Sequence, residues 1–271
     1  MKRIKTKISF VRLGIEEEWT YRFDFFLFQF GDLLSVLINF FIWKAVFENS
    51  TQEKLEGFSL KEMYLYIFLS FFANTLIYSD VSFHLGEEIK NGNIIYRFLK
   101  PINFVDTYLF KEIGSKVSVI LFLVAPFFSG LLYLVYNDKI ILNNLSLHVL
   151  GFTISISFAY LLNFYFNICF SYSAFIFKNL WGANLLKKTM ISFISGSILP
   201  LSFFPKNIQS IFEMLPFSSI IYTPIMIGIG KYAGKTLVLS ILIQLFWVCF
   251  FMFLSEILLR LTLKFLVIHG G

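Results

Sequence analysis

The chain has 271 residues, of which 57% are hydrophobic, 20% are aromatic and only 15% are charged, and its formal net charge is +6 at pH 7. A soluble domain needs more polar side chains on its surface than this composition supplies, so the sequence predicts an integral membrane protein. Anionic lipid headgroups and the charge bias of membrane insertion account for the positive charge. We therefore expect membrane lipid around the chain and no nucleic acid as a partner.

The first 23 residues predict an amphipathic helix that lies in the cytoplasmic surface of the membrane. Apolar side chains recur in it at steps of three or four residues, which places them on one stripe: Ile4, Ile8, Val11, Ile15 and Trp19. Basic residues surround this stripe. The segment holds no apolar core of the 7 to 15 residues that a signal peptide needs. The alternative is a solvated leader that supplies only positive charge.

Apolar runs long enough to cross a bilayer follow this segment, because a transmembrane helix takes about 20 residues. The runs cover 24–47, 61–83, 105–136, 146–177, 188–204 and 236–260. The sequence therefore predicts an all-α polytopic membrane protein with a single transmembrane domain over 1–271. Within it, a six-span bundle occupies 24–260 and a cytoplasmic tail occupies 261–271.

Charge distribution sets the expected orientation of the spans. Most of the 23 Lys and Arg lie in the N-terminal segment, the 84–116 region, the 178–188 loop and the C-terminal end. Cytoplasmic loops carry such an excess, so we expect both termini in the cytoplasm. On the outer side, the segment 205–235 contains prolines and apolar stretches too short to cross, which predicts a re-entrant or interfacial element. It would serve either as a gate or as a lid that only stabilises the bundle.

The loop 84–104 lies between the second and third predicted spans and is longer than a simple connector needs to be. Apolar residues at helical spacing follow the turn sequence Asn91-Gly92-Asn93: Ile94, Ile95, Phe98 and Leu99. We expect a short amphipathic helix there, with Arg97 and Lys100 projecting and Pro101 ending it. Such a helix, held parallel to the membrane, can transmit force from a soluble partner.

The same loop resembles a known family. Its segments Glu88-Ile89-Lys90-Asn91-Gly92-Asn93-Ile94 and Phe98-Leu99-Lys100-Pro101 are similar to the cytoplasmic loop of permease subunits of type 2 ABC exporters, in the small six-span bacterial branch. The proline-containing segments over 199–205, 215–217 and 222–224 resemble the fifth span and external re-entrant segment of that branch. The terminal Gly270-Gly271 is similar to the end of many of its members. The resemblance extends from the first loop to the last residue.

The resemblance implies a transport subunit of the bacterial cytoplasmic membrane that has no ATP site and binds no cofactor of its own. The sequence agrees, because it contains no G-x-x-x-x-G-K-[ST] loop. The expected partners are a cytoplasmic ABC ATPase, which would bind ATP and Mg²⁺, and a second permease subunit. The loop would be the coupling helix that contacts the ATPase. The implied coupling residues are Glu87, Glu88, Lys90, Gly92, Arg97, Lys100 and Pro101.

Polar residues also occur inside the predicted spans, where an ionised side chain is costly. One hypothesis is that they line a pathway for a hydrophobic or amphipathic substrate such as a lipid, a peptide or an antibiotic. The alternative is that they form hydrogen bonds between helices. The candidate pathway residues are Gln29, Asp32, Asn39, Asn74, Asn163 and Asn167.

Other functions fit the sequence less well. A membrane-embedded enzyme would need catalytic or metal-binding motifs, and neither H-E-x-x-H nor G-x-S-x-G is present. Cys169 and Cys249 lie in apolar runs, which argues against a disulfide framework or a zinc site. A self-sufficient secondary carrier would show internal repeats, and none is evident between the halves. A purely structural scaffold would leave the loop 84–104 unexplained.

Overall fold

The computed structural model describes residues 2–99, 102–136, 145–175 and 180–269. Apart from one short antiparallel hairpin, the described elements are helices. In chain order they are α1 (Lys2–Thr20), α2 (Arg22–Glu48), β1 (Lys54–Leu55), β2 (Phe58–Ser59), α3 (Leu60–Ile77), α4 (Val81–Lys90), α5 (Ile94–Phe98), α6 (Phe104–Tyr136), α7 (Leu145–Ser171), η1 (Tyr172–Phe175), α8 (Leu180–Ile194), η2 (Leu201–Phe203), α9 (Lys206–Met214), α10 (Tyr222–Ile229) and α11 (Lys235–His269).

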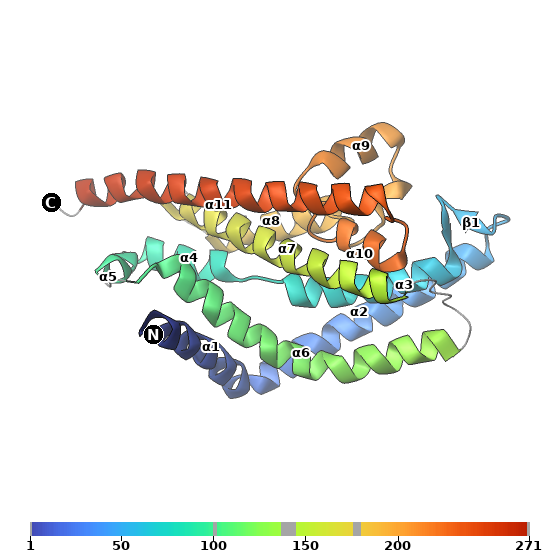
Figure 1. Cartoon of the computed structure of the whole chain (residues 1–271), viewed down its shortest axis with the longest axis horizontal. Helices are drawn as coiled ribbons and strands as arrows, with labels where there is room; N and C mark the ends of the chain where they lie inside the picture. Colours follow the sequence, from blue (N-terminus) through green and yellow to red (C-terminus); the bar gives the residue numbers. More distant parts are fainter. Residues whose placement is uncertain (1, 100–101, 137–144, 176–179, 270–271) are drawn as a thin grey trace.

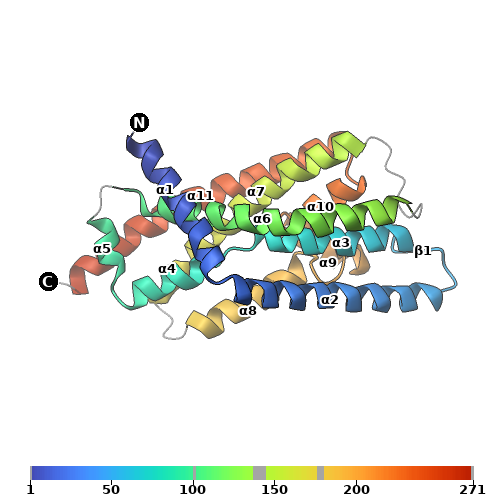
Figure 2. The ribbon, with the colours of Figure 1, turned by 90° about the horizontal axis from the view of Figure 1, so that it is seen from below.

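The long helices run along the long axis of the molecule (Figures 1 and 2). The start of α1, the short helix α5 and the last turns of α11 lie at one end, which we call the loop end (Figure 1). The β1–β2 hairpin lies at the other, the hairpin end. Among the described residues, four helical segments are long and apolar enough to cross a membrane: Phe26–Glu48, Leu60–Lys90, His148–Phe175 and Lys235–Thr262. The fold is therefore that of an all-α membrane protein.

Two predicted spans differ from the helices observed. The second run, 61–83, is divided into α3 and α4 by a break at residues 78–80. The fifth run was predicted at 188–204, whereas α8 begins at Leu180 and ends at Ile194. Gly196 has a φ of +81°, and the hydroxyl of Tyr66 donates a hydrogen bond to its carbonyl, so the chain leaves the helix at this point.

A large buried core lies where α3, α7 and α10 meet. Met63 and Ala73 on α3, Leu162 on α7 and Ile225 on α10 are all 0% exposed. The short helix α10 is therefore enclosed by longer helices, as its many apolar side chains require. In contrast, α9 contains no buried residue. The predicted external segment, 205–235, thus holds one buried and one exposed short helix.

The β1–β2 hairpin is tied to the turn that follows α10. The Lys231 ammonium donates a hydrogen bond of 2.6 Å to the carbonyl of Gly57 and lies 3.2 Å from the centre of the Phe58 ring. It also lies 3.7 Å from the Glu62 carboxylate at the start of α3. Burial lowers the pKa of Lys231, and the nearby Glu62 opposes this effect. These contacts join segments far apart in the sequence at the hairpin end.

Candidate functional site

The loop between α3 and α6 is a folded element made of α4, a turn and α5. Gly92 has a φ of +73°, as the predicted turn requires. Arg97 donates hydrogen bonds from Nε and Nη2 to the two carboxylate oxygens of Glu88, and its guanidinium carbon lies 4.6 Å from the centre of the Tyr108 ring. The prediction that Arg97 projects is therefore wrong, because a bidentate carboxylate and an aromatic face hold it inward.

The other predicted coupling residues differ in their surroundings. Glu87 and Lys90 are exposed at the end of α4. Lys100 and Pro101 lie outside the described residues. The coupling role of all these residues stays a prediction. Their placement shows only that Glu88, Gly92 and Arg97 shape the loop, while Glu87 and Lys90 are available at its surface.

The ion pair between Arg97 and Glu88 gives a first testable expectation. Arg97→Glu should loosen the contact between α5 and α4, because two carboxylates would then face each other beside Tyr108. Limited proteolysis in detergent should show faster cleavage within the loop. Exchanging both charges, with Glu88→Arg and Arg97→Glu in one chain, should recover much of the protection. Equal cleavage of the Arg97→Glu chain and the unaltered chain would contradict the assigned role of the pair.

The outer surface of the loop carries apolar side chains. Ile95, Tyr96 and Leu99 are 47%, 67% and 76% exposed, and we call these three residues the loop patch. Ile94, in contrast, is buried against the bundle. An exposed apolar patch outside the spans marks an interaction surface more often than an ordinary solvated loop.

The break between α3 and α4 frees backbone groups that a continuous helix would bond internally. At the end of α3, the carbonyl of Ile77 accepts a hydrogen bond of 2.8 Å from the Asn163 side-chain amide of α7. The carbonyl of Thr75 accepts one of 3.3 Å from the Lys116 ammonium of α6. Interrupted helices persist at membrane depth only where such groups are satisfied by neighbours. Side chains of α7 and α6 therefore satisfy the carbonyl groups that the break leaves free at the end of α3.

The start of α4 is capped from another helix by Glu112 of α6. One carboxylate oxygen of Glu112 accepts hydrogen bonds from the Val81 amide, at 3.2 Å, and from the Ser79 hydroxyl, at 2.9 Å. The other accepts a bond of 3.2 Å from the hydroxyl of Tyr160 on α7. Asp80, the residue just before α4, makes no capping hydrogen bond. A carboxylate at a helix N-terminus is also favoured by the helix dipole, so Glu112 stabilises the break in two ways.

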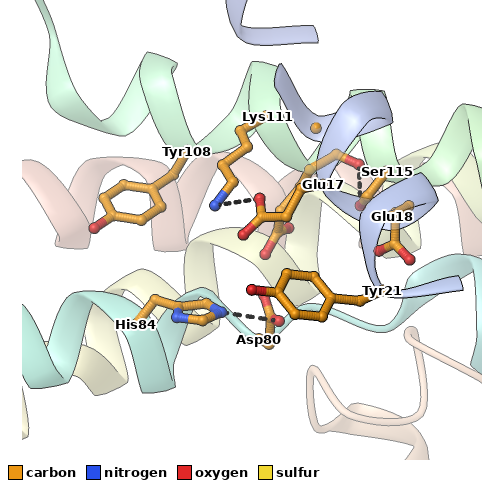
Figure 3. Close-up of a pocket in the computed structure, with 10 residues that line it drawn as sticks. Glu17, Glu18, Tyr21, Asp80, His84, Tyr108, Lys111 and Ser115 are labelled. Carbon is orange, nitrogen blue, oxygen red and sulfur yellow. Dashed lines mark hydrogen bonds and ion pairs between the residues drawn. The ribbon is translucent and has the colours of Figure 1, made fainter. Parts of the chain in front are cut away.

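A cavity of about 140 Å³ lies beside the break, between α1, α4 and α6. Figure 3 shows Glu17 and Glu18 of α1, and Tyr21 just after that helix, around the cavity together with Asp80 and His84. The remaining lining residues are Gly14, Tyr108, Lys111, Glu112 and Ser115. The Lys111 ammonium lies 2.6 Å from the Glu17 carboxylate, and the His84 ring lies 3.2 Å from Asp80 (Figure 3). Charged groups of α1, of α6 and of the first turn of α4 with the residue before it thus gather around one cavity.

Helices α1 and α6 cross at two glycines. A Cβ atom on Gly14 would lie 2.0 Å from the carbonyl oxygen of Lys111, and one on Gly114 would lie 2.0 Å from that of Val11. The backbones therefore touch, as small residues permit in membrane helices. Of the predicted apolar stripe, Ile8 and Trp19 remain 61% and 49% exposed. Helix α1 is therefore attached to the bundle and also presents apolar side chains outward.

The six candidate pathway residues lie in different surroundings. Asn163 of α7 donates a hydrogen bond of 2.8 Å to the Ile77 carbonyl of α3, and Asn167 of α7 accepts one from the Lys187 ammonium of α8. These contacts favour the alternative of hydrogen bonds between helices. Within α2, the Asn39 side chain donates a hydrogen bond to the carbonyl of Ser35, one turn earlier, and Asp32 is exposed. Gln29 lies one turn before Asp32. A lining role for any of the six stays a prediction.

Sequence reasoning missed several groups that the structure brings together. Glu112 and Lys116 lie inside an apolar run, and an ionisable residue at such a place was itself a signal. Lys187 was assigned to a loop. In the structure Lys187 is part of α8. Its ammonium donates hydrogen bonds to Ser82 and Asn184, at 2.6 and 2.9 Å, and to Asn167.

Long apolar helices joined by a folded loop are typical of a transporter's membrane subunit. No curated protein matches the chain. A family model described as "ABC-2 family transporter protein" matches residues 33–270, which is most of the chain. The chain therefore belongs to the ABC-2 family of transporter proteins, as a multi-pass permease.

Proposed function

We propose that this chain is the membrane-spanning subunit of an ATP-driven exporter and that a separate cytoplasmic ATPase, binding ATP and Mg²⁺, supplies the energy. The loop α4–turn–α5 carries this proposal. It is stiffened by the pair between Glu88 and Arg97, fixed to α6 through Glu112, and it presents the loop patch outward. A folded element with an exposed apolar surface suits a soluble partner that pushes on it.

The loop end would face the cytoplasm of a bacterial cell, with both termini on that side. Basic residues concentrate in the segments that form this end. The hairpin, α9 and α10 would then close the external side. Two such subunits would form the pathway together. ATP binding would draw two ATPase subunits towards each other. Their motion would displace α5 and α4, and the displacement would be transmitted across the break to α3.

The substrate in this proposal is hydrophobic or amphipathic, because the spans are rich in aromatic and aliphatic side chains. Alternating access requires two states that differ in their contacts with the ATPase and the substrate. The break between α3 and α4 is a suitable place for such a difference, because the backbone groups beside it form hydrogen bonds with side chains of other helices. A self-sufficient carrier is the second candidate function.

The loop patch provides a direct test of coupling. Tyr96→Ala combined with Leu99→Ser should lower association with the ATPase about tenfold or more, because exposed aromatic anchors contribute strongly to interfaces. Membrane insertion and thermal stability should stay unchanged, since both side chains are largely exposed. Met214→Ser is a matched control, because Met214 is 78% exposed at the end of α9. Unaltered ATPase association in the double variant would remove the patch from the interface.

The decisive experiment is gentle purification of the tagged chain from its native host, followed by mass spectrometry of everything that accompanies it. A stoichiometric ATPase with a phosphate-binding loop is the expected result. A second, different permease in the same complex would identify a heterodimer. If the chain stayed alone even after crosslinking in the membrane, the exporter subunit would be rejected and the self-sufficient carrier would take its place.

A further inference from the structure

The Lys187 side chain is held between α4, α7 and α8 by uncharged groups. Its ammonium donates hydrogen bonds to the Ser82 hydroxyl at 2.6 Å, to the Asn184 side-chain oxygen at 2.9 Å and to that of Asn167. It also lies 4.5 Å from the centre of the Phe170 ring. Within the described residues, Lys187 takes part in no salt bridge. Ionisable groups among membrane helices are normally paired or functional, and the acceptors of this ammonium are all neutral.

The side-chain amide of Asn184 adds a hydrogen-bond donor at the same place. Its oxygen accepts from the Ser82 hydroxyl at 2.7 Å as well as from Lys187. Its Nδ2 is buried and has no hydrogen-bond partner within the described part of the chain. An unsatisfied buried donor costs free energy, and so does a buried charge without a counter-charge. A single anionic group would satisfy both.

The ammonium can turn to such a group at little cost to its neighbours. The three N–H donors of Lys187 are matched by three neutral acceptors, so an anionic oxygen would replace one of them. Because the Ser82 hydroxyl donates directly to Asn184, these two side chains stay bonded to each other when the ammonium turns away. A hydrogen bond between two ionised groups is stronger than the neutral contact that it replaces.

The surroundings of Lys187 favour a lipid as the source of the anion. Lys187 and Asn184 are only half-buried, so an outside group can approach them. Leu186 and Met190, which lie beside Lys187 on α8, are 68% and 62% exposed. Apolar side chains of this kind lie in hydrocarbon, where a soluble anion does not reach and an acyl chain does. Basic pockets between membrane helices at the cytoplasmic side are known to hold lipid headgroups.

We propose that Lys187 and Asn184 bind the phosphate group of an anionic lipid whose acyl chains lie along α8. The phosphate supplies a negative charge to the ammonium, and one of its oxygens accepts a hydrogen bond from Nδ2 of Asn184. Because Ser82 belongs to the first turn of α4, the lipid lies beside the loop, directly after the break. This site goes beyond the proposed function, and binding there does not require the ATPase.

Native mass spectrometry of the purified, delipidated chain measures the binding. The probe is phosphatidylglycerol, and phosphatidylcholine, whose headgroup has no net charge, is the comparison. The unaltered chain should prefer phosphatidylglycerol. Lys187→Met should weaken its binding about tenfold or more, because a hydrogen bond between charged groups is lost. Lys188→Met is the matched control and should weaken it much less, because Lys188 is exposed and its ammonium lies 5.7 Å from the centre of the Tyr78 ring.

Equal losses in the two lysine variants would mean that surface charge alone attracts the lipid, and would overturn the proposal. Asn184→Asp gives a second test that does not depend on how the methionine variant folds. The new carboxylate still accepts from Ser82 and Lys187 and neutralises the ammonium within the chain. Thermal stability in detergent should therefore be kept or raised, and the preference for phosphatidylglycerol should be lost.

Phosphatidylglycerol binding that survives in Asn184→Asp would contradict the site, as would equal binding of the two lipids by the unaltered chain. Excess inorganic phosphate separates a lipid from a soluble anion. It should leave phosphatidylglycerol bound, because free phosphate gains nothing from the apolar side chains of α8. Displacement by inorganic phosphate would overturn the assignment to a lipid. Each of these outcomes is independent of whether an ATPase accompanies the chain.

Discussion

Replacing Gly114 with leucine is expected to separate α1 from α6. The first atom of the new side chain would lie 2.0 Å from the Val11 carbonyl oxygen, and neither backbone can move without displacing its helix. A glycine in a helix costs about 1 kcal/mol relative to alanine, so the substitution gains at most that amount. Overpacking costs about 1–3 kcal/mol even where flexible side chains can give way. The steric term should therefore outweigh the gain in helix propensity.

Crosslinking between α1 and α6 measures this effect. The Lys7 ammonium lies 3.2 Å from the Asp106 carboxylate, so cysteines at these positions should be joined by a short bifunctional reagent. Crosslinking should be largely lost in Gly114→Leu. Gly31→Leu is the matched control, because a Cβ atom at Gly31 meets nothing within 4 Å. Retained crosslinking in Gly114→Leu would mean that α1 and α6 do not cross at these glycines.

Replacing Glu112 with leucine is expected to destabilise the start of α4. It removes the acceptor of the Val81 amide and of the Ser79 and Tyr160 hydroxyls. An unsatisfied buried donor costs about 1–3 kcal/mol, and the two hydroxyls can turn to other acceptors. We therefore expect a loss on the order of 3 kcal/mol in the free energy of unfolding, together with poorer transmission of force through the break.

Hydrogen exchange at the Val81 amide reports the local effect, and thermal unfolding in detergent reports the global one. Exchange should accelerate in Glu112→Leu and change less in Glu112→Gln, whose carbonyl still accepts one bond. Glu256→Gln provides a control, because Glu256 is exposed on α11. Slow exchange at Val81 in the leucine variant would show that another group caps α4.

The candidate site was only partly predictable. Asn91-Gly92-Asn93 predicted its turn because positive φ is a local requirement of the backbone, and Gly92 adopts it. The direction of Arg97 was not predictable, since it depends on Glu88 and on Tyr108 of α6 meeting around it. The break inside the run 61–83 was equally hidden. No residue within that run reveals that Glu112, Lys116 and Asn163 of other helices form hydrogen bonds with the backbone on either side of the break.

The sequence by itself determined that this protein lies in a membrane, that it is helical, and roughly where most of its long helices run. Composition and periodicity are properties of short stretches. In the hydrocarbon of a membrane the backbone must satisfy its own hydrogen bonds, and a helix does so within a single stretch. Only the tertiary structure decided that Gly14 lies against Lys111 and Gly114 against Val11, that α10 is enclosed, and that a carboxylate of α6 caps α4. Each of these depends on groups far apart along the chain coming within a few ångströms, a relation that no local pattern contains.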